Sequence, residues 1–238
     1  ECVRGLADAC EFFDLPVIGG NVSLNNEFAG DPIDPTPLVC VAGIIDVSTN
    51  ATAQTIPNGD VSFVLVGDVP SHLGATLYQE VMFEQRAGDA PPLDLEREAM
   101  QSDFMRTEIG RNRVLAAHDV SDGGMLVALT EMLFHSDQTF GADLDLRDLP
   151  IKRLDETLFG ESQGHMLIAC TANAVDRIIH DAERYQVTAD FIGTANKTGM
   201  LNIRAPHIDH PLTWKVQELR DSWETTLPDA MNRDAFVD

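Results

Sequence analysis

The sequence predicts a mixed α/β fold of the α+β class, in which helices flank a mixed sheet, and three observations favour it. Short apolar runs typical of buried strands, such as residues 61–66 and 166–170, are separated by segments with helical periodicity, such as residues 125–134 and 173–185. The two kinds of segment do not alternate strictly, which disfavours a Rossmann arrangement. A hydrophobic fraction of 44% is enough for a sizeable core.

The first part of the chain predicts a small piece of structure that ends in a linker. Apolar residues at helical spacing predict a helix over residues 1–14, and a short strand follows at 15–18. A turn-rich connector at 30–37 leads to a nearly continuous apolar strand at 38–47. Residues 49–60 are polar and rich in helix and strand breakers, so we expect a linker there and a domain boundary.

The second part predicts one larger domain. Its expected strands are residues 61–66, 114–117, 142–146, 166–170, 191–193 and 200–204. Its expected helices are residues 92–113, 125–134, 173–185 and 212–225.

Composition excludes several classes of function. The formal net charge of −23 argues against nucleic-acid binding. The sequence contains no run of about 18 apolar residues, so we expect no membrane-spanning helix. The four cysteines, Cys2, Cys10, Cys40 and Cys170, form no metal-binding spacing, so we expect free thiols and a cytoplasmic location. The chain starts with Glu and lacks a signal segment, which suggests a processed or trimmed product or a fragment. With only three lysines, the chain would have to bind phosphate through metal ions and backbone N–H groups.

A first polar loop, GGNVSLNNE at residues 19–27, follows the predicted strand 15–18. Its two glycines allow a ligand to approach the backbone closely. Asn21 offers an amide oxygen suited to Mg²⁺, and Ser23 can hydrogen-bond a substrate oxygen. The last residues of the loop could equally be turn formers.

A second polar loop lies in AAHDVSDGGMLVALTEM, residues 116–132. Unpaired N–H groups at its glycine-rich helix start could hold an anion, and Asp119 could bind a divalent ion that neutralises the anion. The alternative is that Ser121 or Asp122 simply caps the helix. His118 suits acid–base chemistry or, as the alternative, a structural hydrogen bond at the strand end.

A third polar loop, in LFGESQGHMLIAC at residues 158–170, precedes a buried strand. Glu161, Ser162 and Gln163 place one carboxylate and two hydrogen-bonding groups toward one cleft. The alternative is a loop that satisfies its own backbone.

The three loops in this order resemble the phosphoribosylformylglycinamidine synthase family, within the aminoimidazole ribonucleotide synthetase-like superfamily. The matching segments are PVIGGNVSLNNE followed by PTPLVCVAGIIDV, then AHDVSDGGMLVALTEM, then LFGESQGHMLI. The resemblance implies an ATP-dependent carbon–nitrogen ligase of purine biosynthesis. It would convert formylglycinamide ribonucleotide to formylglycinamidine ribonucleotide through an iminophosphate, with ammonia from a glutaminase subunit.

The resemblance also implies that the chain is the C-terminal portion of a two-copy synthetase. Residues 1–48 would be the tail of the second N-type domain, 61–228 the second C-type domain, and 229–238 a C-terminal tail. The partners would be the missing N-terminal part, the glutaminase and a small bridging subunit. The catalytic residues would lie in the missing part, so this chain alone would be inactive.

Residue by residue, the resemblance implies roles for the three loops. Gly20 and Ser121 would bind nucleotide, Asn21 and Asp119 would bind Mg²⁺, and Ser23 would bind the substrate. Residues 161–163 would be a second-copy version of a substrate-binding Glu-Ser-Gln, and ADP could remain at a structural site. Two alternatives stay open, an aminoimidazole ribonucleotide synthetase-type ATP enzyme and a non-catalytic scaffold domain that holds nucleotide.

Overall fold

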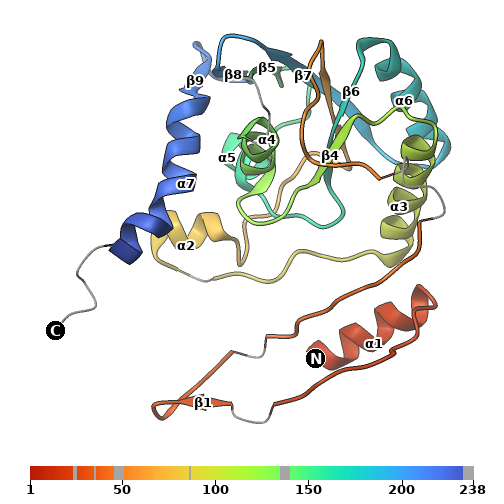
Figure 1. The fold of residues 1–238 in the computed structure, drawn as a ribbon, viewed down its shortest axis with the longest axis vertical. Coiled ribbons are helices and arrows are strands. Elements are labelled where there is room, and N and C mark those ends of the chain that lie inside the picture. The colour runs from red at the N-terminus through yellow and green to blue at the C-terminus, as the bar shows by residue number, and fades with distance from the viewer. Residues whose placement is uncertain (24–25, 35, 46–50, 86, 135–139, 233–238) are drawn as a thin grey trace. The chain divides into compact units, whose positions relative to one another are not determined.

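The computed structural model describes residues 1–23, 26–34, 36–45, 51–85, 87–134 and 140–232 (Figure 1). The chain forms two compact units, Glu1–Asp46 and Val47–Asp238, and each is described by itself. Within the described residues, no helix is long and apolar enough to cross a membrane.

Unit 1 holds helix α1 (Cys2–Phe12) and a small antiparallel pair, β1 (Glu27–Phe28) and β2 (Asp31–Pro32). The predicted helix is confirmed, but the strand predicted at 15–18 is wrong. The strand predicted at 38–47 is also wrong for residues 38–45, and its last two residues lie outside the described part. A strand needs a neighbour that pairs its backbone groups, and the described part of unit 1 offers these two runs none.

Unit 2 is built on a seven-stranded sheet of order β4-β6-β3-β7-β5-β8-β9 (Figure 1). Neighbouring strands are antiparallel except β5 and β8, which are parallel. Its strands are β3 (Ser62–Val66), β4 (Ala116–Asp119), β5 (Gly141–Asp145), β6 (Met166–Cys170), β7 (Ala189–Asn196), β8 (Met200–Arg204) and β9 (Leu212–Lys215). This mixed sheet confirms the predicted fold class.

Helices cover both faces of the central strands. They are α2 (Leu77–Phe83), α3 (Leu95–Gly110), α4 (Gly124–Phe134), α5 (Leu154–Phe159), α6 (Ala172–Arg184) and α7 (Val216–Asn232). Side chains of β3 alternate between two cores. Phe63 and Leu65 pack in a core with α4, whereas Val64 and Val66 pack in a core with α3 and α6. Burial on both faces explains why this strand reads as a continuous apolar run.

The prediction from the sequence was wrong or incomplete for three parts of unit 2. Residues 212–225 do not form a single helix, because residues 212–215 pair with β8 as β9 before α7 begins. The short helices α2 and α5 were not expected from the sequence. Strand β7 is also longer than the predicted 191–193, because its whole length pairs with β3 and β5.

Candidate functional site

Three loops meet at one end of the sheet. Strand β6 runs antiparallel between β3 and β4, so its first residue, Met166, pairs with the last residues of both neighbours, Val66 and Asp119. The loop before β6 therefore lies beside the loops that follow β3 and β4. This topology brings the second and third predicted loops together.

A first cleft of about 410 Å³ lies between these loops and contains five of the predicted site residues. They are Asp119, Ser121, Glu161, Ser162 and Gln163. Asp122 and Glu98 add further carboxyl groups, and no lysine or arginine is among the described residues that line the cleft. Such a cleft disfavours a bare anion and favours a ligand that carries a cation.

Asp119 is the predicted metal ligand that lies in the first cleft, and its carboxylate is accessible. Its side chain is 68% exposed and stands at the end of β4. No group of three or more His, Cys, Asp or Glu side chains within the described ranges is arranged to hold a metal ion. A Mg²⁺ ion here would therefore need oxygen ligands from a substrate or from water, which is common for this ion.

Glu161 is engaged with the backbone of two other segments. Its Oε1 accepts hydrogen bonds from the N–H groups of Gly123 and Leu77, each at 2.9 Å. The expectation of unpaired N–H groups at the glycine turn is therefore wrong for Gly123. The N–H of Gly124 is also used, because it donates to the carbonyl of Ser121 at 2.9 Å.

The other two members of the third loop differ in their contacts. Ser162 Oγ accepts a long hydrogen bond of 3.4 Å from the N–H of Ser71. Gln163 is exposed and lines the first cleft, so its amide is accessible to a ligand. The loop thus satisfies backbone groups, as the alternative interpretation expects, and still presents one polar side chain to the cleft.

His118 makes the contacts of a structural histidine. Its side chain is 11% exposed, Nε2 lies 2.8 Å from a carboxylate oxygen of Glu131, and Nδ1 lies 2.7 Å from the carbonyl of Asp119. Both ring nitrogens are thus used inside the protein, which favours the structural interpretation over acid–base chemistry.

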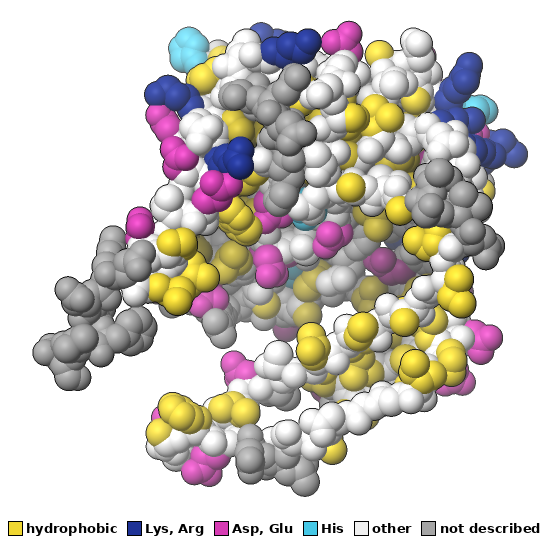
Figure 2. All heavy atoms as spheres, viewed as in Figure 1, with side chains coloured by type: hydrophobic (Ala, Val, Ile, Leu, Met, Phe, Trp, Pro, Cys, Tyr) yellow, Lys and Arg dark blue, Asp and Glu magenta, His cyan; other side chains and the backbone are white. Residues whose placement is uncertain are grey.

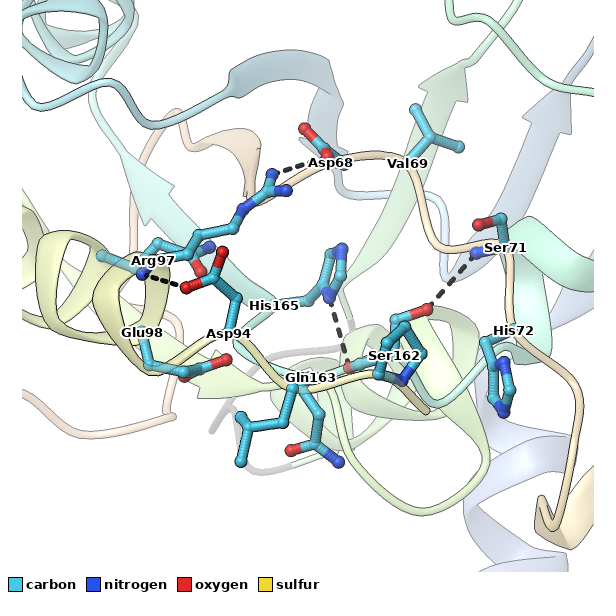
Figure 3. A pocket seen from close by; sticks show the side chains of 13 residues that line it. Asp68, Val69, Ser71, His72, Asp94, Arg97, Glu98, Ser162, Gln163 and His165 are labelled. Atoms are coloured by element: carbon cyan, nitrogen blue, oxygen red, sulfur yellow. Dashed lines mark hydrogen bonds and ion pairs between the residues drawn. The ribbon is translucent and has the colours of Figure 1, made fainter. Parts of the chain in front are cut away.

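A second cleft of about 320 Å³ lies on the other side of the third loop (Figure 3). Asp68, which follows β3, forms an ion pair of 2.6 Å with Arg97 of α3. Burial raises the pKa of the Asp68 carboxyl, but hydrogen bonds from Arg97 and Thr188 outweigh it, so the net pKa is below its usual value. Burial raises the pKa of Glu98, which lines both clefts.

His165 lies between the two clefts and is 8% exposed. Its Nδ1 is 3.2 Å from the carbonyl of Ser162, and since a carbonyl only accepts, Nδ1 carries the proton (Figure 3). Its Nε2 has no hydrogen-bond partner in the described part of the chain. Burial lowers the pKa of His165, so the ring is neutral at pH 7.

Sequence reasoning missed this second cleft. Its polar residues come from the loop after β3, from the first turns of α3 and from the loop before β6. One signal was available, because Asp68 comes two residues after the buried strand β3, and Asp119 likewise stands at a strand end. The contributions of α3 have no local signal, since charged residues on a helix usually face solvent.

The predicted residues of the first loop belong to unit 1. Gly20, Asn21 and Ser23 are exposed and lie outside regular secondary structure. Their expected contacts with nucleotide, metal and substrate stay predictions.

Comparison with known proteins identifies the family. Residues 59–205 match the family described as "AIR synthase related protein, C-terminal domain". The chain belongs to this family. The match confirms the predicted aminoimidazole ribonucleotide synthetase-like fold.

Curated relatives extend the similarity to almost the whole chain. The phosphoribosylformylglycinamidine synthase subunit PurL of Bartonella tribocorum is 34% identical over 98% of this chain, and that of Bartonella henselae is 35% identical over 96%. The resemblance stated from the three loops is therefore confirmed. The chain spans 30% of the length of each of these relatives.

A solved structure shares the fold. PurL of Thermotoga maritima complexed with FGAR has a TM-score of 0.62 and 18% identity, over 73% of this chain and 30% of that chain. The same protein complexed with ATP has a TM-score of 0.58 at 18% identity over 73% of this chain and 28% of that chain.

Proposed function

We propose that this chain is the C-terminal part of a phosphoribosylformylglycinamidine synthase, an ATP-dependent ligase of purine biosynthesis. The observation that carries the proposal is 34% identity over 98% of the chain to a protein of that name. The reaction would be the conversion of formylglycinamide ribonucleotide to formylglycinamidine ribonucleotide, with ammonia from a glutaminase subunit in the cytoplasm.

Within this proposal, residues 61–228 of unit 2 form the second C-type domain. Residues 1–48, which include all of unit 1, are the tail of an N-type domain. The surface of unit 1 supports its assignment. Helix α1 buries none of its residues, and large apolar side chains of unit 1 are exposed, among them Ile18 at 91%, Leu38 at 98% and Ile44 at 96% (Figure 2). A segment with so much apolar surface gains little from folding by itself, and it suits a part of a larger domain.

The first cleft would hold a nucleotide as its magnesium complex, at a site equivalent to the active site of the first half. Asp119 would contribute one oxygen to Mg²⁺, Ser121 would contact the nucleotide, and Gln163 would present its amide. PurL of Thermotoga maritima has been solved with ATP, with ADP and with AMPPCP, which supports a nucleotide as the ligand.

Residues Gly20, Asn21 and Ser23 would contribute to the active site formed with the first half. Asn21 would bind Mg²⁺ through its amide oxygen, while Gly20 would contact ATP and Ser23 the ribonucleotide. The chain alone would then be inactive. Glutaminase and bridging subunits would be its partners, in line with a solved PurLQS assembly from Thermotoga maritima.

The test is a chimera in which this chain replaces the matching 30% of the Bartonella tribocorum subunit. We expect ATP- and ammonium-dependent formation of formylglycinamidine ribonucleotide by the chimera and none by the chain alone. Asn21→Ala in the chimera should lower turnover, whereas Asn173→Ala, at an exposed position of α6, should not. A folded, inactive chimera that binds nucleotide would favour the scaffold alternative.

A further inference from the structure

Glu161 joins three segments that are distant in sequence. Its single carboxylate oxygen Oε1 accepts from Gly123, in the turn before α4, and from Leu77, the first residue of α2. Its own N–H donates to the carbonyl of His72 at 3.1 Å. A loop that only satisfied its own backbone would not use its carboxylate to connect two other elements.

The charge of Glu161 has no cationic side chain to balance it in the first cleft, where the described lining residues include no lysine or arginine. Backbone N–H groups take that role. The turn of Gly123 leads directly into α4, an 11-residue helix, and the start of a helix carries partial positive charge. Hydrogen bonds from backbone N–H groups to a carboxylate are charge-assisted, and they are stronger than bonds between neutral groups.

The turn itself is fixed in a conformation that suits this contact. Gly123 and Gly124 have φ angles of +80° and +77°, which glycine adopts without strain. A Cβ at Gly124 would lie 2.6 Å from the backbone of Phe159, in the helix just before the third loop. The glycine turn and the third loop are therefore packed together, which keeps Glu161 within hydrogen-bonding distance of Gly123.

We propose that Glu161 is an internal anion that occupies the N–H of the glycine turn and positions the start of α2 against it. An external anion at this turn would have to displace Glu161 to use Gly123. The same displacement would release Leu77, so the position of α2 depends on what Gly123 binds.

Helix α2 has the properties of an element that such a contact could position. It has only seven residues, and it carries the exposed side chains of Val81, Met82 and Phe83. A further contact of α2 is made by Tyr78, whose ring stacks on Phe159 with centroids 5.0 Å apart. Glu161 thus provides a polar contact between this helix and the site.

The test compares the backbone amides of Gly123 and Leu77 by ¹⁵N NMR in the 238-residue chain and in its Glu161 variants at pH 7. In Glu161→Ala, which removes the shared acceptor, both amide resonances should shift. In Glu161→Gln, which keeps an acceptor oxygen, both shifts should be smaller. A shift of only one of the two amides in Glu161→Ala would overturn the proposal.

A neighbouring carboxylate provides a matched control. Asp122 lines the same cleft and adjoins Gly123 in sequence, so its removal could shift the Gly123 amide directly, but it should not act on Leu77. Asp122→Asn should therefore leave the Leu77 amide unshifted, and a shift as large as that in Glu161→Ala would contradict the assignment to Glu161.

Hydrogen exchange and phosphate provide two further measurements. Glu161→Ala should speed exchange of both amides by about tenfold or more, because a bond to a charged acceptor is lost. Millimolar inorganic phosphate that shifts the Gly123 amide of the unmodified chain should shift the Leu77 amide as well, and a saturable shift of Gly123 alone would contradict the proposal. No nucleotide is present in these experiments, so their outcome is independent of the synthase assignment.

Discussion

A buried ion network fixes α3, the helix that contributes Arg97, Glu98 and Gln101 to the second cleft. Glu108, in its last turn, is 0% exposed and accepts from Arg111 at 2.9 Å and from Arg113 at 3.0 Å. Asp181 of α6 accepts from the same two arginines at 2.6 and 2.7 Å. The network therefore ties the end of α3 to α6.

We predict that Glu108→Gln strongly destabilises unit 2. Each charge-assisted hydrogen bond contributes about 1.5–3 kcal/mol, and glutamine retains one neutral bond of about 1 kcal/mol, so the loss is about 2–5 kcal/mol. Removing one partner of a buried ion pair costs about 3–5 kcal/mol, which agrees with this range. For a domain of about 150–250 residues, 1 kcal/mol shifts Tm by about 2–4 °C. A loss of about 3 kcal/mol therefore predicts a decrease in Tm of about 6–12 °C.

Thermal unfolding followed by circular dichroism measures this decrease. The control is Glu96→Gln, an exposed glutamate in the first turn of the same helix, which should change Tm by less than about 2 °C. Equal effects of the two substitutions would refute the reasoning, because burial of Glu108 would then carry no energetic consequence.

Acid should weaken the same network. The hydrogen bond from Arg113 holds the pKa of Asp181 below its usual value of 3.8. A group with a lowered folded pKa stabilises the protein above its unfolded pKa, and this contribution is lost as pH falls through the folded pKa. The free energy of unfolding should therefore fall below about pH 4, and Asp181→Asn should reduce that dependence. If the free energy of unfolding of the variant falls at low pH as much as that of the unmodified chain, Asp181 is not the source of the decrease.

Three further predictions concern the first cleft, the glycine turn and a buried thiol. Calorimetric titration with Mg-ADP should show binding that Asp119→Asn weakens and that chelation of the metal abolishes; binding of ADP without metal at equal affinity would contradict the proposed site. Gly124→Ala should lower the free energy of unfolding, measured with urea, by at least about 1–2 kcal/mol, because alanine is strained at φ +77° and its Cβ would meet the backbone of Phe159. An unchanged free energy of unfolding would show that the turn adapts. Burial raises the pKa of the Cys170 thiol to about 11, so a thiol reagent should label exposed Cys2 quickly and Cys170 only on unfolding. Rapid labelling of every thiol in the native state would contradict the burial of Cys170.

The predicted strands of unit 2 were largely confirmed because burial on both faces leaves a clear pattern. Residues 62–66 and 166–170 are apolar throughout or nearly so, and they pair with each other inside the sheet, each with a further strand on its other side. The runs at 15–18 and 38–45 look similar in sequence but form no strands. An apolar run indicates a tendency toward burial, whereas a strand also requires a partner, which the run itself does not encode.

The first cleft could be predicted in outline, but the bonds of Glu161 could not. Polar residues at strand ends pointed to Asp119, Ser121 and residues 161–163, and the structure places them together. Whether Glu161 faces a ligand or the backbone depends on where α2 begins. Helix α2 is short, and its first turn is stabilised by Thr76 and by Glu161 itself, so tertiary contacts decide its position.

The charges around the first cleft decide which form of nucleotide it can accept. Its carboxyl groups come from Glu98, Asp119, Asp122 and Glu161, and burial lowers the pKa of His165, the one histidine among the described residues that line it. Two like charges about 4 Å apart repel by about 4 kcal/mol at an effective dielectric constant near 20, so a bare diphosphate is disfavoured. Glu161 also occupies the N–H of Gly123, a donor that could otherwise offset this repulsion. A divalent cation beside Asp119 reverses the sign of the interaction, so nucleotide binding in this cleft should depend on the metal more than on any single protein side chain.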